Sequence, residues 1–299
     1  MTARMRFVGV STASSSIMRI FPVWADLLGL DAELVGLDLP LEAAPEDYRR
    51  ALTGMREDPD CVGALVTTHK ISLLEATRDL FDDLDPFAAT VGEVSSIAFR
   101  DGRTHGSAKD PLTAGLALEE VLGEDHFSDG GEVVCLGAGG AGTAIGWYLA
   151  HRADRAAAMS FVDVSPSRLE HLREVLTTAA PEVPVRTVPV AQADLAATLP
   201  DLPAGSLVVN ATGLGKDRPG SPLPDGVLLP RGSVVWELNY RGSLEFLHQA
   251  QAQAADRDLT VVDGWRYFIH GWTQVIAEVF GVPMGTDRVA ELSDAARSA

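Results

Sequence analysis

A glycine-rich segment offers the clearest chemistry in the sequence. Gly137, Gly139 and Gly142 have the G-x-G-x-x-G spacing of loops that bind dinucleotide phosphates. The first glycine permits a tight turn, the second lets the backbone approach a pyrophosphate, and the third allows close packing of a helix on a strand. Free N–H groups at the helix N-terminus would bind the phosphates. A glycine-rich turn without a ligand is the alternative. The residues predicted to bind a cofactor here are Gly137, Ala138, Gly139, Gly140, Ala141 and Gly142.

An acidic residue beyond this loop indicates which dinucleotide is used. Asp163 ends the next expected strand, 21 residues after Gly142. A carboxylate there accepts hydrogen bonds from the adenosine ribose hydroxyls and repels the 2′-phosphate of NADP. Val164 adds no positive charge, whereas Arg168 could partly accommodate that phosphate. We therefore expect NAD, with NADP less favoured, and place Asp163, Val164, Ser165 and Arg168 near the adenosine.

Lysine is rare in this chain. It occurs at Lys70, Lys109 and Lys216, so 21 of the 24 basic residues are arginine (24 − 3 = 21). A position that keeps lysine can need what arginine does not supply, namely a compact ammonium whose pKa can be lowered until it exchanges a proton. Chance is the alternative. The three lysines are therefore candidates for proton transfer.

Strand and helix patterns alternate along the chain, which predicts parallel sheets with right-handed crossovers. Asp101-Gly102 is typical of a hairpin turn, and Asp82, Asp83 and Asp85 are interpreted as a solvated helix end. Strands are expected at 6–11, 33–37, 61–66, 95–100, 132–136, 160–163, 185–188, 206–210, 233–236 and 260–262. Helices are expected at 15–28, 45–55, 110–122, 143–152, 265–280 and 287–298.

The expected fold class is α/β, with an N-terminal α/β domain at 1–110 and a Rossmann NAD(P)-binding domain at 123–262. A polar connector at 123–131 separates them. The C-terminal helices at 265–299 follow the last expected strand, and we expect them to pack back on the first domain. The active site would then lie in the cleft that the two domains form.

Composition excludes several classes of function. The net charge is −18 and the pI is about 4.7, which argues against nucleic acid as a partner. The longest apolar runs are too short to span a bilayer and the start resembles no secretory leader, so a cytoplasmic protein is expected. Cys61 and Cys135 lie in apolar runs and are expected to be buried free thiols. The seven histidines show no metal-binding spacing, so no metal is expected.

Segments along almost the whole chain resemble, in order, the motifs of the shikimate/quinate dehydrogenase family. Gly63–Lys70 resembles G-x-N-V-T-x-P-x-K, Gly92–Ile97 resembles G-A-V-N-T-L, and Gly106–Asp110 resembles G-x-N-T-D. The glycine loop matches the family's loop. Asn210–Gly215 resembles N-x-T-S-x-G, Glu237–Tyr240 resembles D-x-x-Y, and Asp263-Gly264 resembles the start of D-G-x-x-M-L-x-x-Q.

The resemblance implies a catalytic pair, Lys70 and Asp110, in a substrate-binding domain. An amine tuned toward neutral pKa could take the hydroxyl proton while hydride leaves to nicotinamide. An ordinary ion pair that joins strand to helix is the alternative. The resemblance also implies substrate-binding residues: Ser14, Ser15, Ser16, Thr67, Ser95, Tyr240, His270, Gly271 and Gln274. It adds cofactor-binding residues after later strands: Asn210, Ala211, Thr212, Gly213 and Leu238.

Several positions depart from the family motifs. Ile17 replaces the proline of the serine loop in the simplest register, in which Ser14 and Ser16 are the two serines; a one-residue shift would use Ser15 instead. Ser95 and Ala108 replace asparagines, and Gly271 replaces a glutamine. A site with unpaired substrate hydroxyls loses about 1–3 kcal/mol for each missing partner. Shikimate itself is therefore expected to be a poor substrate, and a bulkier or less polar ring would suit Ile17, Trp265 and Trp272.

The sequence thus predicts an NAD-dependent oxidoreductase that interconverts a secondary alcohol and a ketone on a shikimate- or quinate-like cyclic hydroxy acid. Amino-substituted and cyclitol-type rings are alternative substrates. A catalytically idle dinucleotide-binding regulatory protein is the alternative from another class. The expected partners are a small cyclic molecule and, at most, a second copy of the chain, since a monomer and a homodimer are both compatible with the sequence.

Overall fold

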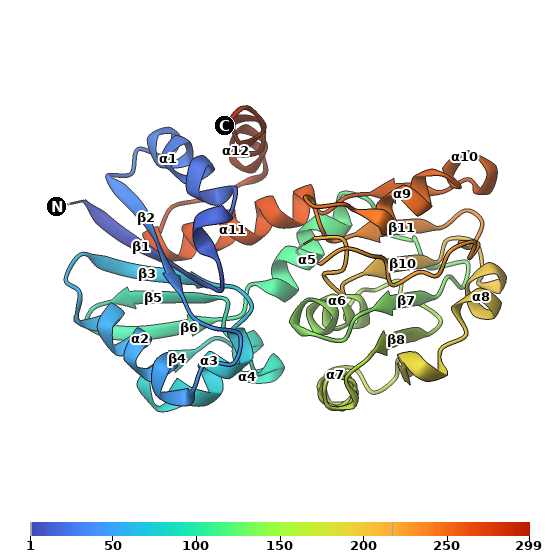
Figure 1. Ribbon diagram of the computed structural model, residues 1–299, viewed down its shortest axis with the longest axis horizontal. Coiled ribbons are helices and arrows are strands. Elements are labelled where there is room, and N and C mark those ends of the chain that lie inside the picture. Colours follow the sequence, from blue (N-terminus) through green and yellow to red (C-terminus); the bar gives the residue numbers. More distant parts are fainter. Residues whose placement is uncertain (1, 217) are drawn as a thin grey trace. The chain divides into compact units, whose positions relative to one another are not determined.

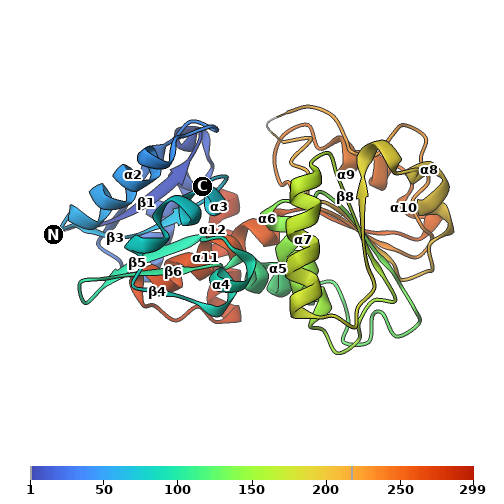
Figure 2. The same cartoon turned by 90° about the horizontal axis from the view of Figure 1, so that it is seen from below.

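The computed structural model describes residues 2–216 and 218–299. The chain divides into two compact units (Figures 1 and 2). The first comprises Met1–Asp110 with Ile269–Ala299, and the second comprises Pro111–Phe268. Each unit is built on a six-stranded sheet, which confirms the predicted α/β class.

The sheet of the first unit is mixed, in the order β2-β1-β3-β5-β6-β4. β1 lies parallel to both β2 and β3, whereas β5 is antiparallel to β3 and β6. The β5–β6 hairpin turns at Asp101 and Gly102, which both have positive φ (53° and 72°), as the Asp-Gly pair predicts. The strands are β1 (Ala3–Gly9), β2 (Ala32–Asp38), β3 (Cys61–Val66), β4 (Asp83–Leu84), β5 (Ser96–Arg100) and β6 (Arg103–Ser107).

Helices cover this sheet, and the C-terminal helices are among them, as predicted (Figure 1). Trp24 on the first helix is buried and donates its indole N–H to Leu292 O at 2.7 Å. The Trp272 ring packs edge-on against Phe7 at 4.9 Å between centroids. The helices are α1 (Ile17–Leu28), α2 (Pro45–Glu57), α3 (Lys70–Thr77), α4 (Pro86–Val91), α11 (Trp265–Phe280), which begins in the second unit, and α12 (Thr286–Ser298).

Asp82, Asp83 and Asp85 were interpreted as a solvated helix end, but they lie around β4 and at the start of α4. Asp83 begins β4, and Asp82 accepts a hydrogen bond from Thr104 N at 2.7 Å. Asp85 caps α4 by accepting from Ala88 N at 2.6 Å, and its Oδ1 also accepts from Ala108 N at 3.2 Å. These side chains replace missing backbone partners at an irregular corner of the sheet.

The second unit contains an all-parallel sheet in the order β12-β11-β10-β7-β8-β9. Alternate residues of β7 face opposite layers: Val133 and Cys135 pack with α5, α6 and α7, whereas Val134 and Leu136 pack with α8 and α9. The strands are β7 (Val133–Leu136), β8 (Met159–Asp163), β9 (Val185–Pro189), β10 (Leu207–Asn210), β11 (Val234–Glu237) and β12 (Thr260–Val262). The helices are α5 (Asp110–Glu119), α6 (Gly140–Ala150), α7 (Pro166–Ala179), α8 (Leu195–Thr198), α9 (Glu245–Gln251) and α10 (Ala254–Arg257).

This strand order is that of a Rossmann domain. From β7, the chain adds β8 and β9 on one side of the sheet and then β10, β11 and β12 on the other. Ligands bind at the carboxyl ends of the strands where the strand order reverses in this way. The glycine loop follows β7, which puts it at that point. Within the described residues, the structure has no helix that is both long and apolar enough to cross a membrane.

Candidate active site

Lys70 and Asp110 meet at one edge of the first sheet. Lys70 begins α3 just beyond β3, and Asp110 begins α5 just beyond β6. β5 lies between these strands and is antiparallel to both, so β3 and β6 end at the same edge. Lys70 Nζ donates a hydrogen bond to Asp110 Oδ2, and the two side chains are 21% and 9% exposed. The predicted pair is therefore an ion pair close to the surface of this unit.

The segment between α4 and β5 holds the backbone of Lys70 and the backbone next to Asp110. Val94 N donates to Lys70 O at 3.2 Å, and Lys109 N donates to Ser95 Oγ at 2.7 Å. Ser95 itself is buried, and its N–H is bonded to Ser107 O at 2.9 Å. The Ser95 hydroxyl, at a position where the family motif has asparagine, thus holds the backbone next to Asp110.

The electrostatics of Lys70 differ from the sequence-based expectation. Burial lowers the pKa of Lys70, but the negative charges of Asp110 and Glu93 and the hydrogen bond to Asp110 outweigh it. The pKa of Lys70 is therefore raised, and the expectation of a lowered value was wrong. Lys70 is an ammonium at neutral pH and can act as a proton donor.

Glu93 is the member of this group that sequence reasoning missed. It is only 2% exposed. Burial raises the pKa of Glu93 to about 7; the Lys70 charge lowers this pKa and the Asp110 charge raises it further, but both effects are smaller than that of burial. The available signal was a single carboxylate inside an otherwise uncharged run from Thr90 to Phe99.

Other predicted substrate residues cluster at the same sheet edge. Ser14, Ser15 and Ser16 follow β1, and Thr67 follows β3, its parallel neighbour. Ser14 is exposed and donates to Ser11 O at 3.0 Å, while Ser15 and Ser16 are half-buried. Thr67 Oγ1 donates to Val8 O at 3.3 Å.

The remaining predicted substrate residues are divided between the units. His270, Gly271 and Gln274 lie on α11 in the first unit, where His270 is buried and the other two are half-buried. Tyr240 belongs to the second unit, and its ring is tilted by 32° against that of Phe268 at 4.2 Å between centroids.

The apolar residues expected to suit a less polar ring differ in exposure. Ile17 is 0% exposed and Trp272 is 5% exposed, so both are core residues of the first unit and offer no surface to a substrate. Trp265 is half-buried in the second unit, with its ring 5.9 Å from that of Tyr240. The expectation that Ile17 and Trp272 accommodate the ring was therefore wrong.

The glycine loop has the geometry that a dinucleotide requires. Gly137 has φ +113°, and a Cβ there would lie 2.6 Å from Ala211 O; a Cβ at Gly142 would lie 2.2 Å from Gly137 O. A Cβ at Gly139 would meet nothing within 4 Å among the described residues. The first and third glycines are thus required by the fold, whereas the second leaves open space at the start of α6, where a pyrophosphate would approach.

Asp163 fastens this loop to β8. It is 8% exposed, its Oδ2 accepts from Ala138 N at 2.8 Å, and its Oδ1 accepts from Ser165 N at 2.8 Å. Val164 is 76% exposed, and Arg168 is exposed in the first turn of α7. Asp163 therefore brings negative charge to the predicted adenosine position and also organises the backbone there.

The turn after β10 is held by a buried hydrogen-bond network. Asn210 Nδ2 donates to Glu237 Oε2 at 2.7 Å, and Asn210 Oδ1 accepts from Thr212 N and Oγ1 at 3.1 and 2.7 Å. Glu237 Oε1 accepts from Asn239 N at 2.8 Å, and burial raises the pKa of Glu237 to about 7. The Asn210 side chain is thus occupied within the fold, which leaves the backbone of this turn for a cofactor.

A cavity of about 340 Å³ adjoins the glycine loop and this turn. The predicted cofactor residues Ala141, Ala211, Gly213 and Leu238 line it. Two exposed cations that sequence reasoning had not placed there, Lys216 and Arg218, line it too. Its remaining lining residues are Asn239 and Tyr267. The positive charge and the glycine loop suit a ligand that carries phosphates.

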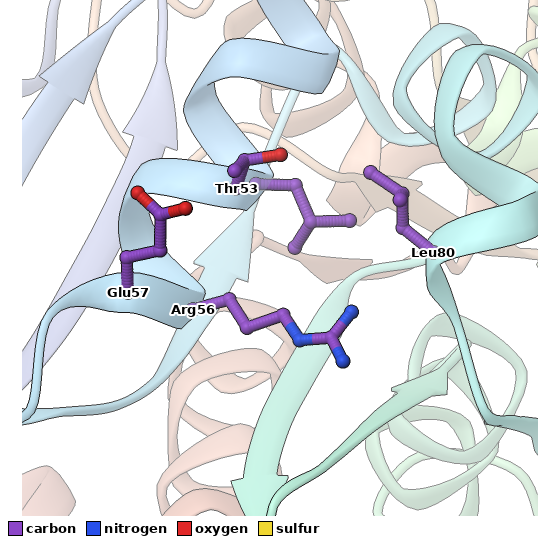
Figure 3. A pocket seen from close by; sticks show the side chains of 5 residues that line it. Thr53, Arg56, Glu57 and Leu80 are labelled. Atoms are coloured by element: carbon purple, nitrogen blue, oxygen red, sulfur yellow. The ribbon is translucent and has the colours of Figure 1, made fainter.

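A second cavity, of about 300 Å³, opens beside α2 (Figure 3). Leu52, Thr53, Arg56, Glu57 and Leu80 line it, and none of them is a predicted site residue. Over the described ranges, three or more His, Cys, Asp or Glu side chains nowhere gather to hold a metal, and Cys61 and Cys135 are buried free thiols.

Comparisons with known proteins place these features in a family. No family model matches the sequence. The chain is 31% identical over 244 residues to a shikimate dehydrogenase (NADP(+)) of Symbiobacterium thermophilum, covering 81% of this chain and 76% of that protein. Among solved structures, the quinate dehydrogenase of Corynebacterium glutamicum in complex with NAD matches with a TM-score of 0.77 and 20% identity, covering 100% and 99% of the two chains.

The fold also matches a protein with another substrate. The ligand-free 5-ketofructose reductase of a Gluconobacter species aligns with a TM-score of 0.74 and 21% identity over 100% of this chain and 99% of that one. Identity at this level shows the shared fold alone. Together with the sequence relative, the two-unit fold and the glycine loop, it leads to one conclusion: this chain belongs to the shikimate/quinate dehydrogenase family of NAD(P)-dependent oxidoreductases.

Proposed function

We propose that this protein interconverts a secondary alcohol and a ketone on a cyclic hydroxy compound related to shikimate or quinate, with Lys70 and Asp110 handling the proton. The observation that carries the proposal is the Lys70–Asp110 ion pair, set at a sheet edge beside Thr67 and the Ser14–Ser16 loop. An ordinary structural pair needs no such neighbours.

The chain's own residues have distinct tasks in this reaction. A bound nicotinamide supplies or accepts the hydride. Lys70, an ammonium, donates a proton to the ketone oxygen as negative charge develops there, and in the reverse direction its amine accepts the hydroxyl proton. Asp110 accepts a hydrogen bond from Lys70 Nζ, so it orients the ammonium and stabilises its charge.

The proposed cofactor is NAD, with NADP less favoured. The Asp163 carboxylate at the end of β8 supports this preference, because it would lie near a 2′-phosphate and repel it. Arg168, exposed in the first turn of α7, is the candidate for binding such a phosphate, and the relative from Symbiobacterium is named for NADP(+). Fluorescence titration with both cofactors tests this preference, and we expect NAD to bind more tightly than NADP.

The proposed ring substrate differs from shikimate itself. Ala108 and Gly271 carry no hydrogen-bonding side chain, and the Ser95 hydroxyl already accepts a backbone N–H. Each unpaired substrate hydroxyl would weaken binding by about 1–3 kcal/mol. Amino-substituted and cyclitol-type rings stay in consideration, since this fold also serves a 5-ketofructose reductase.

A panel assay tests the proposal. Wild-type protein is incubated with NAD or NADP and a series of cyclic alcohols, including shikimate, quinate, amino-substituted rings and cyclitols, and the reduced nicotinamide is followed by absorbance. We expect turnover with at least one ring alcohol and NAD, and its loss in Lys70→Ala. Binding of NAD without turnover of any alcohol would favour the idle, regulatory alternative, for which the altered substrate positions are the observation in support.

A further inference from the structure

Glu93 is a buried carboxyl group for which the proposed reaction has not yet been given a use. It lies in the segment that joins α4 to β5, where the motif G-A-V-N-T-L has alanine. Its residue exposure is 2%, and Glu93 Oε1 has no hydrogen-bond partner among the residues that the structure describes. Burial of a carboxyl group without a partner is unfavourable, so its retention here calls for a compensating role.

The surroundings of Glu93 connect it to the Lys70–Asp110 pair. The N–H of the next residue, Val94, donates to Lys70 O, which ties this segment to the first turn of α3. The charged groups that act on Glu93 are Lys70, at the start of α3, and Asp110, at the start of α5. The hydrogen bonds from Val94 N to Lys70 O and from Lys109 N to Ser95 Oγ bring one ammonium and two carboxyl groups to this corner of the unit.

We propose that Glu93 is a third ionisable member of this centre, a positioning residue whose carboxyl group controls how readily Lys70 releases and accepts its proton. The inference rests on the proposed function of Lys70. When Glu93 is ionised, its negative charge stabilises the Lys70 ammonium, which then holds its proton more firmly. When Glu93 is protonated, only Asp110 stabilises the ammonium, and Lys70 releases its proton more easily.

Proton balance follows from this arrangement. In ketone reduction the Nζ–H bond breaks, an O–H bond forms on the substrate, and the neutral amine later takes a proton from solvent. Since the pKa of Glu93 is about 7, its charge changes in the neutral range. Ketone reduction should therefore slow as the pH rises through 7, because ionised Glu93 makes the Lys70 ammonium a weaker proton donor.

The scarcity of lysine allows a test that needs no substrate. Protein labelled with ¹³C-lysine gives signals from Lys70, Lys109 and Lys216 alone, and Lys109→Arg and Lys216→Arg assign them. We expect the Lys70 Cε signal to shift with an inflection near pH 7 in the wild type and to lose that inflection in Glu93→Gln. Glu93→Asp keeps a titrating group and should retain an inflection at a displaced pH.

Glu278→Gln is the matched control. Glu278 is a largely buried carboxylate of the same unit, but it lies 3.3 Å from Lys109 Nζ and accepts from Ser107 Oγ at 2.8 Å. Its replacement should alter the Lys109 signal and leave the Lys70 inflection in place. A flat Lys70 signal from pH 5.5 to 8.5 in the wild type would overturn the inference, and so would the same inflection in Glu93→Gln.

Kinetics separate this inference from the proposed function. With any alcohol that the panel identifies, Glu93→Gln should lose the inflection near pH 7 in kcat while KM changes less than about threefold. Unchanged pH profiles in an active Glu93→Gln enzyme would refute the role of Glu93 and leave the dehydrogenase assignment intact. A Lys70 inflection in protein that turns over no alcohol would support the coupling and refute the dehydrogenase assignment.

Discussion

Glu237→Gln should change how the stability of the protein depends on pH. Glu237 is fully buried at the end of β11, and burial raises its pKa from an ordinary 4.5 to about 7, although Asn239 N and Asn210 Nδ2 donate to it. The folded state therefore holds this proton to a higher pH than the unfolded state. By linkage, the contribution of Glu237 to stability falls as the pH rises from about 4.5 to about 7.

The magnitude follows from the two pKa values. A shift of one pKa unit corresponds to about 1.4 kcal/mol. Between pH 5.5 and pH 8.5, Glu237 should lower the free energy of unfolding by about 2 kcal/mol, a change of about thirtyfold in the unfolding equilibrium constant. This range stays above the pI of about 4.7, where the net charge would vanish.

Urea unfolding of the wild type and Glu237→Gln at both pH values, followed by tryptophan fluorescence, measures this change. Trp236 adjoins the substituted residue and reports on the second unit. The free energy of unfolding of Glu237→Gln minus that of the wild type should increase by about 2 kcal/mol from pH 5.5 to pH 8.5. Any cost of the substitution that does not depend on pH cancels between the two conditions, and so does the titration of Glu93.

Glu245→Gln is the control for this experiment. Hydrogen bonds from Ser243 Oγ and Gly220 N lower the pKa of Glu245, so it stays ionised in both states throughout this range. The Glu245 charge is the smallest of the causes that act on the pKa of Glu237, so the free energy of unfolding of Glu245→Gln relative to the wild type should change between the two pH values by much less than about 2 kcal/mol. If the Glu237→Gln difference changed as little, the argument that burial dominates at this carboxyl group would be refuted.

Three further predictions concern ligands. Asp163→Ala should lower the ratio of NAD to NADP affinity, measured by fluorescence titration, because the ribose loses an acceptor and a 2′-phosphate is no longer repelled; an unchanged ratio would point to Arg168 instead. Gly139→Ala should leave the melting temperature unchanged and weaken NAD binding by at least about tenfold, whereas Gly142→Ala should lower both, since its Cβ would lie 2.2 Å from Gly137 O. Shikimate should be a poor substrate, and a kcat/KM of about 10⁴ M⁻¹s⁻¹ or more would contradict that expectation.

Much of the fold could be predicted because its elements carry strong local signals. The apolar strands 61–66 and 132–136 and the glycine loop required only periodicity and glycine placement. β4 and α4 were missed, since they are short and are stabilised by Asp82 and Asp85 rather than by an apolar pattern. The bond from Thr104 N to Asp82 joins residues 22 positions apart and leaves no local pattern, whereas Asp85 followed by Pro86 is a local helix-start signal that was overlooked.

The candidate site was predictable in its residue types but not in its electrostatics. Lys70 and Asp110 were identified by resemblance, yet the direction of the Lys70 pKa depends on two carboxyl groups that folding brings from positions 93 and 110. Likewise, Asn210 fits a cofactor motif, but its amide is held by Glu237, 27 residues further along the chain. Such contacts arise from tertiary structure and have no fixed sequence spacing.

Replacement of Lys70 by arginine tests the central claim most directly. With the best alcohol and NAD, Lys70→Ala should lower kcat by about 10²–10⁴-fold, the share of a general acid–base group. Lys70→Arg should be nearly as damaging, because a guanidinium does not release a proton near neutral pH, although it still pairs with Asp110 and preserves the fold. NAD affinity should hardly change in either variant, since the glycine loop lies in the other unit. A Lys70→Arg enzyme that keeps wild-type turnover, with an alanine variant that loses melting temperature rather than activity, would show that the pair is only structural.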